Sequence, residues 1–240
     1  MPRESTRMSG LTRDRWHRYS WNGDGPLLGV TTALKIQDAL IGGDLARWGG
    51  EIAARYAYAN PDATVADALG AVSAQRDIGT EVHAQIEAIL LGGSPTPTER
   101  TAPYIYSFSA FLAAERPDFA ATEQRIVNLT HRYAGTFDFA ATLPLRGRGL
   151  ALCDVKTGRT RLTHRLQLAG YAAGEFVGIE GDPERHPMLR FRRFYTLLLR
   201  PDGYELVEQR VTAAERRHFL YLVGVYRRLR AWDDAAKKED

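Results

Sequence analysis

The sequence predicts an α/β protein in which a mixed β-sheet is flanked by helices and preceded by a helical N-terminal region. Apolar residues recur at helical spacing over much of 27–120, whereas after residue 120 they alternate with polar residues, and β-branched and aromatic types increase. The order of helices, three strands, a helix, two strands and a helix is typical of helices packed on one mixed sheet. We expect one domain over 1–240, with an arm at 1–26, a mainly helical part at 27–120 and a sheet core at 121–231.

Length and composition are those of a protein with a substantial core. The chain has 240 residues, of which 44% are hydrophobic and 25% are charged, and its formal net charge is +3. These values argue against a disordered, collagen-like or disulfide-scaffold protein. Cys153 is the single cysteine, which excludes an intramolecular disulfide and a four-cysteine site for zinc or iron–sulfur.

The sequence shows no secretion signal and no membrane span. The first residues lack an apolar segment, and no apolar run approaches the roughly 20 residues that cross a bilayer. We therefore expect a soluble, cytoplasmic protein without a membrane partner.

In the N-terminal half, turn formers and periodicity predict each element in order. The cluster Trp21-Asn22-Gly23-Asp24-Gly25-Pro26 predicts a loop that closes the arm. There follow a short strand at 28–34, helices at 37–59, 64–73 and 79–91, a loop at 92–97, and a helix at 104–114. Pro61 and Pro117 end two of these helices, because the residue before a proline avoids helical backbone.

The C-terminal half predicts the sheet. Antiparallel strands are predicted at 123–129, 133–143 and 150–156, followed by a helix at about 163–177, strands at 191–199 and 204–211, and a final helix at 212–231. The turns Arg146-Gly147-Arg148-Gly149 and Pro201-Asp202-Gly203 join the strands of two hairpins.

Two aspartates and a lysine lie at one edge of this predicted sheet. Asp138 ends the run Gly-Thr-Phe-Asp in the second strand, and Asp154-Val155-Lys156 ends the third. Mg²⁺ prefers oxygen ligands, usually one or two carboxylates with water and phosphate oxygens. Strand alternation places Asp154 and Lys156 on one face, while Val155 faces away and offers its carbonyl. The pattern predicts a metal site in which Lys156 positions or deprotonates an attacking water and offsets charge. An ion pair across a hairpin is the commoner interpretation of an isolated D-x-K.

Four further residues gain weight from this group. His83 begins a helix with Glu87 one turn later on the same face, and is a candidate metal ligand. Glu123 opens the first strand as a candidate supporting carboxylate. Gln167 and Tyr171 share a helix face and are placed to reach phosphate or the metal-bound water. Taken singly, each is more often an ordinary surface or packing residue.

These motifs resemble the PD-(D/E)xK nuclease superfamily, most closely its RecB-like branch, which includes small phage exonucleases. That branch carries, in order, a G-x-x-x-H helix, a glutamate strand, a G-x-x-D strand, a D-x-K strand and a Q-x-x-x-Y helix. Here they read GTEVH, Glu123, GTFD, DVK and QLAGY between residues 79 and 171. Val30–Leu34 and the helix after it also look like the amino-terminal portion of the phage members. Five motifs in this order, each on the expected type of element, argue against coincidence.

The resemblance implies a restriction-endonuclease-like core and a nuclease that uses Mg²⁺ or Mn²⁺. It implies that His83, Asp138, Asp154 and the Val155 carbonyl hold the metal, that Asp138, Asp154 and Lys156 are catalytic, and that Glu123, Gln167 and Tyr171 support them. The proline of the superfamily name is absent before Asp138, which is common in this branch. Relatives of the CRISPR-associated exonuclease carry four cysteines for an iron–sulfur cluster, and Cys153 alone cannot provide one. We expect no cluster, and without a G-x-x-x-x-G-K-[ST] loop we expect no ATP-driven motor.

Arginines fit a nucleic-acid substrate. Between Glu184 and Arg230, 11 arginines stand against 5 acidic residues. The candidate DNA contacts are Arg159, Arg161 and Arg165, which follow the D-x-K strand, and Arg192 and Arg193, which begin the hairpin. Arginine contacts to phosphates give affinity without reading base sequence, and they make binding fall as salt rises. For the arginines of the last helix, a solvated face is an equally good interpretation.

We expect a metal-dependent DNA exonuclease that acts in recombination, repair or phage DNA processing. A non-catalytic or partner-activated DNA-binding protein on a nuclease fold, and a hydrolase of small phosphoesters, remain as alternatives. The aromatic residues Tyr104, Tyr106, Phe108 and Phe111 are placed either to stack on bases or, as we favour, to pack in the core. The sequence leaves open exonuclease or endonuclease action, polarity, single or double strands, DNA or RNA, and a recombination-protein partner or homo-oligomer.

Overall fold

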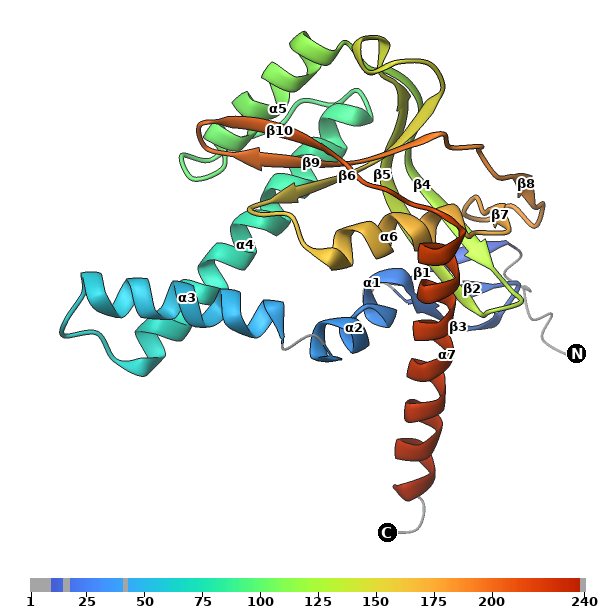
Figure 1. The fold of residues 1–240 in the computed structure, drawn as a ribbon, viewed down its shortest axis with the longest axis horizontal. Helices are drawn as coiled ribbons and strands as arrows, with labels where there is room; N and C mark the ends of the chain where they lie inside the picture. Colours follow the sequence, from blue (N-terminus) through green and yellow to red (C-terminus); the bar gives the residue numbers. More distant parts are fainter. Residues whose placement is uncertain (1–9, 15–17, 41–42, 238–240) are drawn as a thin grey trace, which may run out of the picture.

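The computed structural model describes residues 10–14, 18–40 and 43–237 and contains a curled mixed sheet with helices on both faces (Figure 1). Much of the predicted arm, residues 1–9 and 15–17, lies outside the described residues. In the described ranges, no helix combines enough length and hydropathy to cross a membrane.

The helices are α1 (Val30–Ala33), α2 (Lys35–Leu40), α3 (Asp44–Ala59), α4 (Val65–Leu90), α5 (Ala102–Glu115), α6 (Leu162–Ala172) and α7 (Ala213–Ala236), with a short 3₁₀ helix η1 (Pro144–Arg146). The strands are β1 (Leu11–Arg13), β2 (Tyr19–Trp21), β3 (Asp24–Gly29), β4 (Asp118–Asn128), β5 (Tyr133–Thr142), β6 (Leu150–Thr157), β7 (Phe176–Val177), β8 (His186–Pro187), β9 (Arg193–Arg200) and β10 (Gly203–Glu208). Figure 1 shows α3 and the start of α4 extending to one side of the sheet, and α7 extending away from it toward the C-terminus.

Strand β5 lies at the centre of the sheet. One of its edges pairs with β4 in antiparallel fashion from Asn128↔Tyr133 to Asp118↔Thr142. Its other edge is divided, because β3 pairs in parallel with its first residues and β6 pairs antiparallel with its last four. Beyond β6, the strands β9 (parallel to β6) and β10 complete that side of the sheet. The sheet therefore forks where β3 and β6 separate along β5.

Each face of the sheet buries its own apolar cluster. Phe137 and Leu152 pack with Phe219 on the face covered by α1, α6 and α7, whereas Val155 packs with Phe108 and Phe111 on the face covered by α4 and α5. The core assignment of Tyr104, Phe108 and Phe111 is confirmed, while Tyr106 is 72% exposed. These two clusters fix the sheet between its helices.

Several predicted elements are confirmed. The three antiparallel strands, the helix after them, the hairpin that turns at Pro201-Asp202-Gly203 and the final helix are all present. The loop at 92–97 is present as well. Strong periodicity and unambiguous turn residues mark these segments, which explains why local sequence predicts them.

Five predicted elements have the wrong bounds. The helix at 37–59 is divided into α2, which ends at Leu40, and α3, which begins at Asp44 after Gly43 in a left-handed conformation (φ 66°). The strand at 28–34 keeps only its first two residues, because the chain leaves the sheet after Gly29 and Val30 packs against the bare backbone of Gly135 as the start of α1. The two helices at 64–73 and 79–91 form one helix, α4, since residues 74–78 contain no proline or glycine to break it. The helix at 163–177 ends at Ala172, and Phe176 pairs with Val127 of β4 instead.

The described part of the predicted arm is also more regular than expected. Residues 11–13 and 19–21 form strands β1 and β2, which extend β3 in an antiparallel meander. The turn predicted at Asn22 and Gly23 is present, but Asp24, Gly25 and Pro26 belong to β3. Strands this short carry too few residues for their alternation to be recognised in the sequence.

Candidate active site

The candidate site lies in the fork of the sheet. The ladder between β5 and β6 ends at the pair Phe139–Cys153, and β3 meets β5 only at Tyr133 and Ala134. The edge of β5 between these points faces a cleft of about 610 Å³. Its walls come from β1, β2, β3, α1, α4, β4, β5, β6 and α6. Five of the predicted site residues line it: His83, Glu123, Asp138, Lys156 and Tyr171.

At the fork, where β5 and β6 separate, the Asp138 side chain accepts a hydrogen bond of the kind that backbone carbonyls accept within the ladder. Its Oδ2 accepts a hydrogen bond of 2.5 Å from the backbone N–H of Val155, at the point where the two strands separate. Its Oδ1 lies 3.9 Å from Nδ1 of His83 on α4. A Cβ at Gly79, one turn before His83, would lie 3.1 Å from Thr157 Oγ1. The glycine therefore lets α4 pack closely on the end of β6 and bring His83 to Asp138.

The carboxylate of Asp154 is held from two sides. As predicted from strand alternation, Val155 packs in the opposite core cluster, and Asp154 faces α6 with only 1% of its surface exposed. Its Oδ1 accepts a hydrogen bond of 3.0 Å from Gln167 Nε2, which also donates to Tyr171 Oη at 2.8 Å. Of the predicted supporting pair on α6, Gln167 thus contacts one of the predicted catalytic carboxylates, and Tyr171 contacts Gln167.

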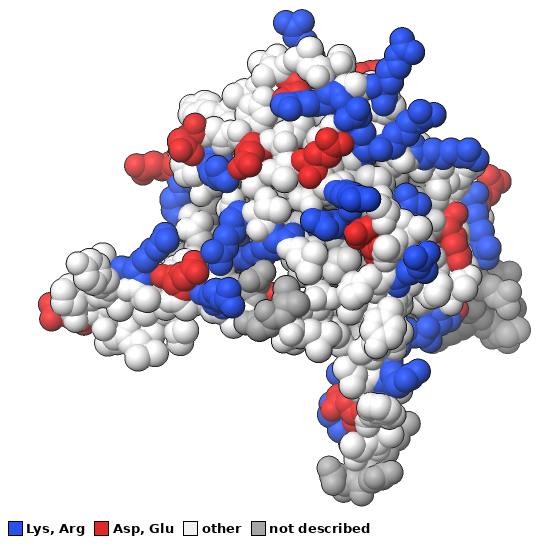
Figure 2. Space-filling model, in the orientation of Figure 1, with Lys and Arg blue, Asp and Glu red and all other residues white. Residues whose placement is uncertain are grey.

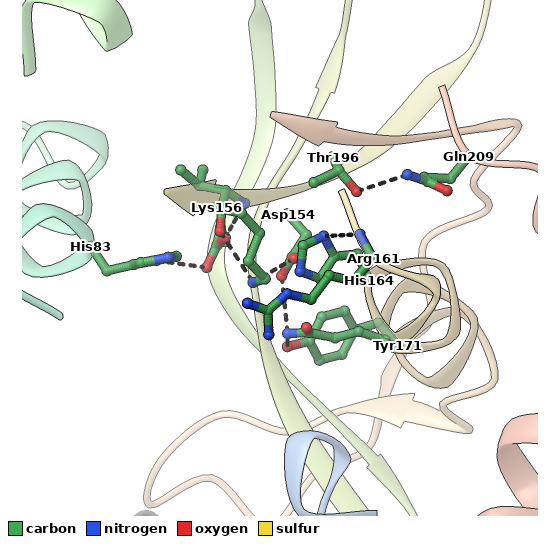
Figure 3. Close-up of polar contacts among 11 residues, drawn as sticks. His83, Asp154, Lys156, Arg161, His164, Tyr171, Thr196 and Gln209 are labelled. Atoms are coloured by element: carbon green, nitrogen blue, oxygen red, sulfur yellow. Dashed lines mark hydrogen bonds and ion pairs between the residues drawn. The ribbon is translucent and has the colours of Figure 1, made fainter. Parts of the chain in front are cut away.

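Lys156 lies among the same oxygen atoms. Its Nζ is 2.5 Å from Asp154 Oδ2, an ion pair without hydrogen-bond geometry, and donates a hydrogen bond of 3.1 Å to the Val155 carbonyl. Figure 3 shows His83 reaching from α4 on one side, and His164 and Tyr171 on α6 on the other, with Asp154 and Lys156 between them. The fork therefore collects a lysine, two carboxylates and a carbonyl in one cluster.

Burial and mutual charge set the protonation of this cluster. Burial raises the pKa of Asp154 to about 6, with the Lys156 ammonium opposing the shift, and burial also raises the pKa of Asp138. Burial disfavours the ammonium of Lys156, but the two carboxylates outweigh it and raise the pKa. Burial and Lys156 lower the pKa of His83 to about 4. Near neutral pH, Lys156 is charged and His83 is neutral, with a lone pair available for a ligand.

Glu123 lies across from Asp138, because Thr122 pairs with Phe139 and Gln124 pairs with Phe137. Its backbone has a φ of 48°, which non-glycine residues rarely adopt. Burial, followed by the carboxylates of Asp138 and Glu87, raises its pKa to about 8. Glu123 does not open the strand as predicted, because β4 begins at Asp118, but its carboxyl group does reach the cleft wall.

The donor set suits a hard divalent cation. Among the described residues, no three His, Cys, Asp or Glu side chains form a metal-binding group. Two carboxylates and a carbonyl are nevertheless the ligands that Mg²⁺ and Mn²⁺ prefer, and a neutral imidazole lies beside them. The ammonium of Lys156 already lies against Asp154 Oδ2 and the Val155 carbonyl, so these oxygens accommodate a positive charge.

The predicted DNA-binding arginines separate into two groups. Arg159 and Arg161 line concavities beside Lys156. Arg165 is half-buried and is not among the residues that line these concavities. Hydrogen bonds with Thr212 lower the pKa of Glu215 on α7, and the charge of Arg165 makes a smaller contribution in the same direction. Arg192 and Arg193 also lie elsewhere.

The position of Arg192 and Arg193 follows from strand direction. Because β9 runs parallel to β6, Lys156 pairs with Leu198, five residues beyond Arg193. At about 3.3 Å per residue this places Arg193 about 16 Å from Lys156 along the sheet. Figure 2 shows one face of the molecule, on which Lys and Arg gather over the upper right and across the middle, with Asp and Glu interspersed. The roles of Arg165, Arg192 and Arg193 as DNA contacts remain predictions.

Sequence reasoning missed several residues that border the site, among them an arginine and a tryptophan. Arg76 lines the cleft from α4, one turn before Gly79, and Trp48 lines the neighbouring concavity from α3. His83 follows Arg76 by seven positions, about two helical turns, so both lie on one helix face. The predicted break at 74–78 hid this relationship, which an uninterrupted helix would have indicated.

Comparison with known proteins gives little further guidance. No protein-family model matches the chain, and no curated protein matches it. A solved structure titled "Crystal structure of SSO0001" is similar with a TM-score of 0.29 and 14% sequence identity. The match covers 50% of this chain and 54% of that chain, so it spans about half the length of each.

Proposed function

We propose that this protein is a metal-dependent DNA exonuclease with a restriction-endonuclease-like core. The observation that carries the proposal is the convergence of Asp138, Asp154 and Lys156 from two strands at the fork. There one carboxylate accepts the Val155 N–H and the other lies 2.5 Å from the lysine ammonium. An ordinary surface ion pair between hairpin strands would not be buried, supported by Gln167 and open to a cleft.

His83, Asp138, Asp154 and the carbonyl of Val155 are the residues that would hold Mg²⁺ or Mn²⁺. When bound, such a cation supplies Lewis-acid polarisation of the phosphate and activation of water. Lys156, which stays protonated near neutral pH, is placed to offset the negative charge that develops on the phosphate during hydrolysis. Gln167 holds Asp154 in its orientation through the hydrogen bond to Oδ1.

Nucleic acid as the substrate is supported by Arg76, Arg159 and Arg161, which line the cleft and the concavity next to it. Arginines contact phosphate oxygens along a strand, whereas a small phosphoester would need only the residues at the fork. Exonuclease action in recombination, repair or phage DNA processing is supported by the order of the five motifs. A DNA-binding protein without cleavage is the alternative, and the intact acidic pair with its lysine favours the enzyme.

The test is cleavage of DNA labelled at either end, single-stranded or double-stranded, with Mg²⁺, Mn²⁺ or EDTA. Lys156→Ala is compared with Lys237→Ala, which removes a lysine from the far end of α7, and circular dichroism establishes that both are folded. We expect metal-dependent shortening from one end that Lys156→Ala abolishes and Lys237→Ala retains. Salt-sensitive DNA binding without cleavage under any metal would overturn the enzyme in favour of the binding protein.

A further inference from the structure

Two smaller concavities continue the cleft on the far side of Lys156. The nearer one, of about 210 Å³, shares Arg76, Gly79, Lys156 and Thr157 with the cleft. The farther one, of about 420 Å³, shares the segment 157–159 and Trp48 with the nearer one. Together they form a passage from the fork of the sheet to α3, which we call the side groove.

The side groove is basic. Five arginines line it together with Lys156: Arg55, Arg76, Arg159, Arg161 and Arg200. Of these, Arg200 pairs with Glu205 at 2.8 Å. Glu51 is the acidic residue of the described lining, 3.5 Å from Arg159. The surplus of positive charge favours an anionic chain along the groove.

Trp48 adds an aromatic surface to this basic lining. It borders both concavities, is half-buried, and is absent from the three buried apolar clusters of the described residues. The guanidinium carbon of Arg161 lies 5.8 Å from the centroid of its ring. An indole beside arginines in a groove is the combination by which proteins hold unpaired bases, which stack on the ring while the cations contact phosphates.

We propose that the side groove binds a single-stranded segment of nucleic acid, with one unpaired base stacked on Trp48 and the adjoining phosphates held by Arg159 and Arg161. In a duplex the bases are paired and stacked on one another, so their faces are not free to meet the indole. The inference rests on the proposed function, because that function is what places a phosphate of the substrate beside Lys156. It deepens that function by assigning a single strand, or the frayed end of a duplex, as the substrate.

The test measures binding rather than cleavage. A fluorescein-labelled oligothymidine of about 12 nucleotides is titrated in EDTA, and its anisotropy is compared with that of a duplex of equal length. We expect Trp48→Ala to weaken single-strand binding about 5- to 150-fold, the range that loss of one base stack produces. Trp48→Phe should recover most of the affinity. Trp232→Ala, which removes a 64% exposed tryptophan on α7, should bind like the parent protein.

A second measurement separates stacking from damage to α3. Single thymidines are replaced in turn by abasic nucleotides, and we expect one position to weaken binding in the parent protein but not in Trp48→Ala. Equal affinity of Trp48→Ala and the parent, equal loss on single strand and duplex, or an abasic series without a sensitive position would each overturn the proposal. Because the titration is done in EDTA, a failure of the end-label cleavage test leaves this result unaffected.

Discussion

Gln167 Nε2 donates a hydrogen bond of 3.0 Å to Asp154 Oδ1, joining α6 to β6. The same nitrogen donates to Tyr171 Oη, so both of its hydrogens are used. We expect Gln167→Leu to lower kcat for DNA cleavage about 10- to 100-fold, with little change in KM, because Asp154 loses the donor that orients it. The metal concentration needed for half-maximal rate should rise.

The matched control is Gln209→Leu. This variant removes a second buried glutamine, whose Nε2 donates a hydrogen bond of 3.3 Å to Thr196 Oγ1. Steady-state kinetics across a metal titration should leave Gln209→Leu near the parent values. If both variants lose the same activity, Gln167 acts through general packing and is not a positioning residue.

Substitution by alanine should have opposite effects on the free energy of unfolding at two helical glycines. A Cβ at Gly170 in α6 would lie 2.7 Å from ring atoms of Phe219, whereas a Cβ at Gly224 in α7 meets nothing within 4 Å. We expect Gly170→Ala to lower the free energy of unfolding by about 1–3 kcal/mol through overpacking. Gly224→Ala should raise it by up to about 1 kcal/mol through helix propensity. Urea denaturation measures both, and stabilisation by Gly170→Ala would contradict the observed packing of α6 against α7.

The local part of the site was predictable from the sequence. Alternation within Asp154-Val155-Lys156 correctly indicated which side chains share a face, because it depends only on strand geometry. The spacing of Gln167 and Tyr171 likewise indicated their shared helix face, and they hydrogen-bond to each other. Short-range periodicity is sufficient for both relationships.

The fork was not predictable. It arises because Leu28 of β3 and Cys153 of β6 pair with different residues of the same edge of β5. Such long-range pairing leaves no periodic trace in any single segment. The position of Glu123 across from Asp138 depends in the same way on the register between β4 and β5. The acidic cluster could therefore be inferred as a set of residue types, but its geometry could not.

An ion pair between a buried carboxylate and a partly exposed arginine, away from the site, should make stability depend on pH. Glu115 is buried and accepts hydrogen bonds from Arg146 Nε at 2.9 Å and from Tyr204 Oη at 3.3 Å. The hydrogen bond from Arg146 holds the pKa of Glu115 below its usual value near 4.5. In the unfolded chain, Glu115 binds its proton at a higher pH than in the folded protein. The ion pair therefore stabilises the fold above about pH 4.5, and this stabilisation is lost as the pH falls through the pKa of Glu115 in the folded protein.

Arg146→Met should therefore reduce the free energy of unfolding by about 1–3 kcal/mol at neutral pH, because it leaves a buried carboxylate without its charged donor. The difference from the parent protein should shrink at acidic pH, once Glu115 becomes protonated in the folded state. Arg200→Met serves as the control, since the exposed pair of Arg200 with Glu205 contributes at most about 1 kcal/mol. A destabilisation by Arg146→Met that is the same at both pH values would show that Glu115 does not titrate as proposed.

The two groups of predicted DNA-binding arginines should differ in their effect on salt dependence. Arg159 and Arg161 line the groove beside Lys156, whereas Arg193 lies at the opposite end of β9, within 3.5 Å of Glu208 and Tyr195 Oη. For single strands, each lost phosphate contact lowers the slope of log affinity against log salt by about 0.7. We expect Arg159→Ala combined with Arg161→Ala to reduce the slope by about 1.4, and Arg192→Ala combined with Arg193→Ala to leave it nearly unchanged. Anisotropy titrations over a range of salt concentrations measure both slopes. A larger reduction for the second pair would place the strand over the start of β9 and away from the side groove.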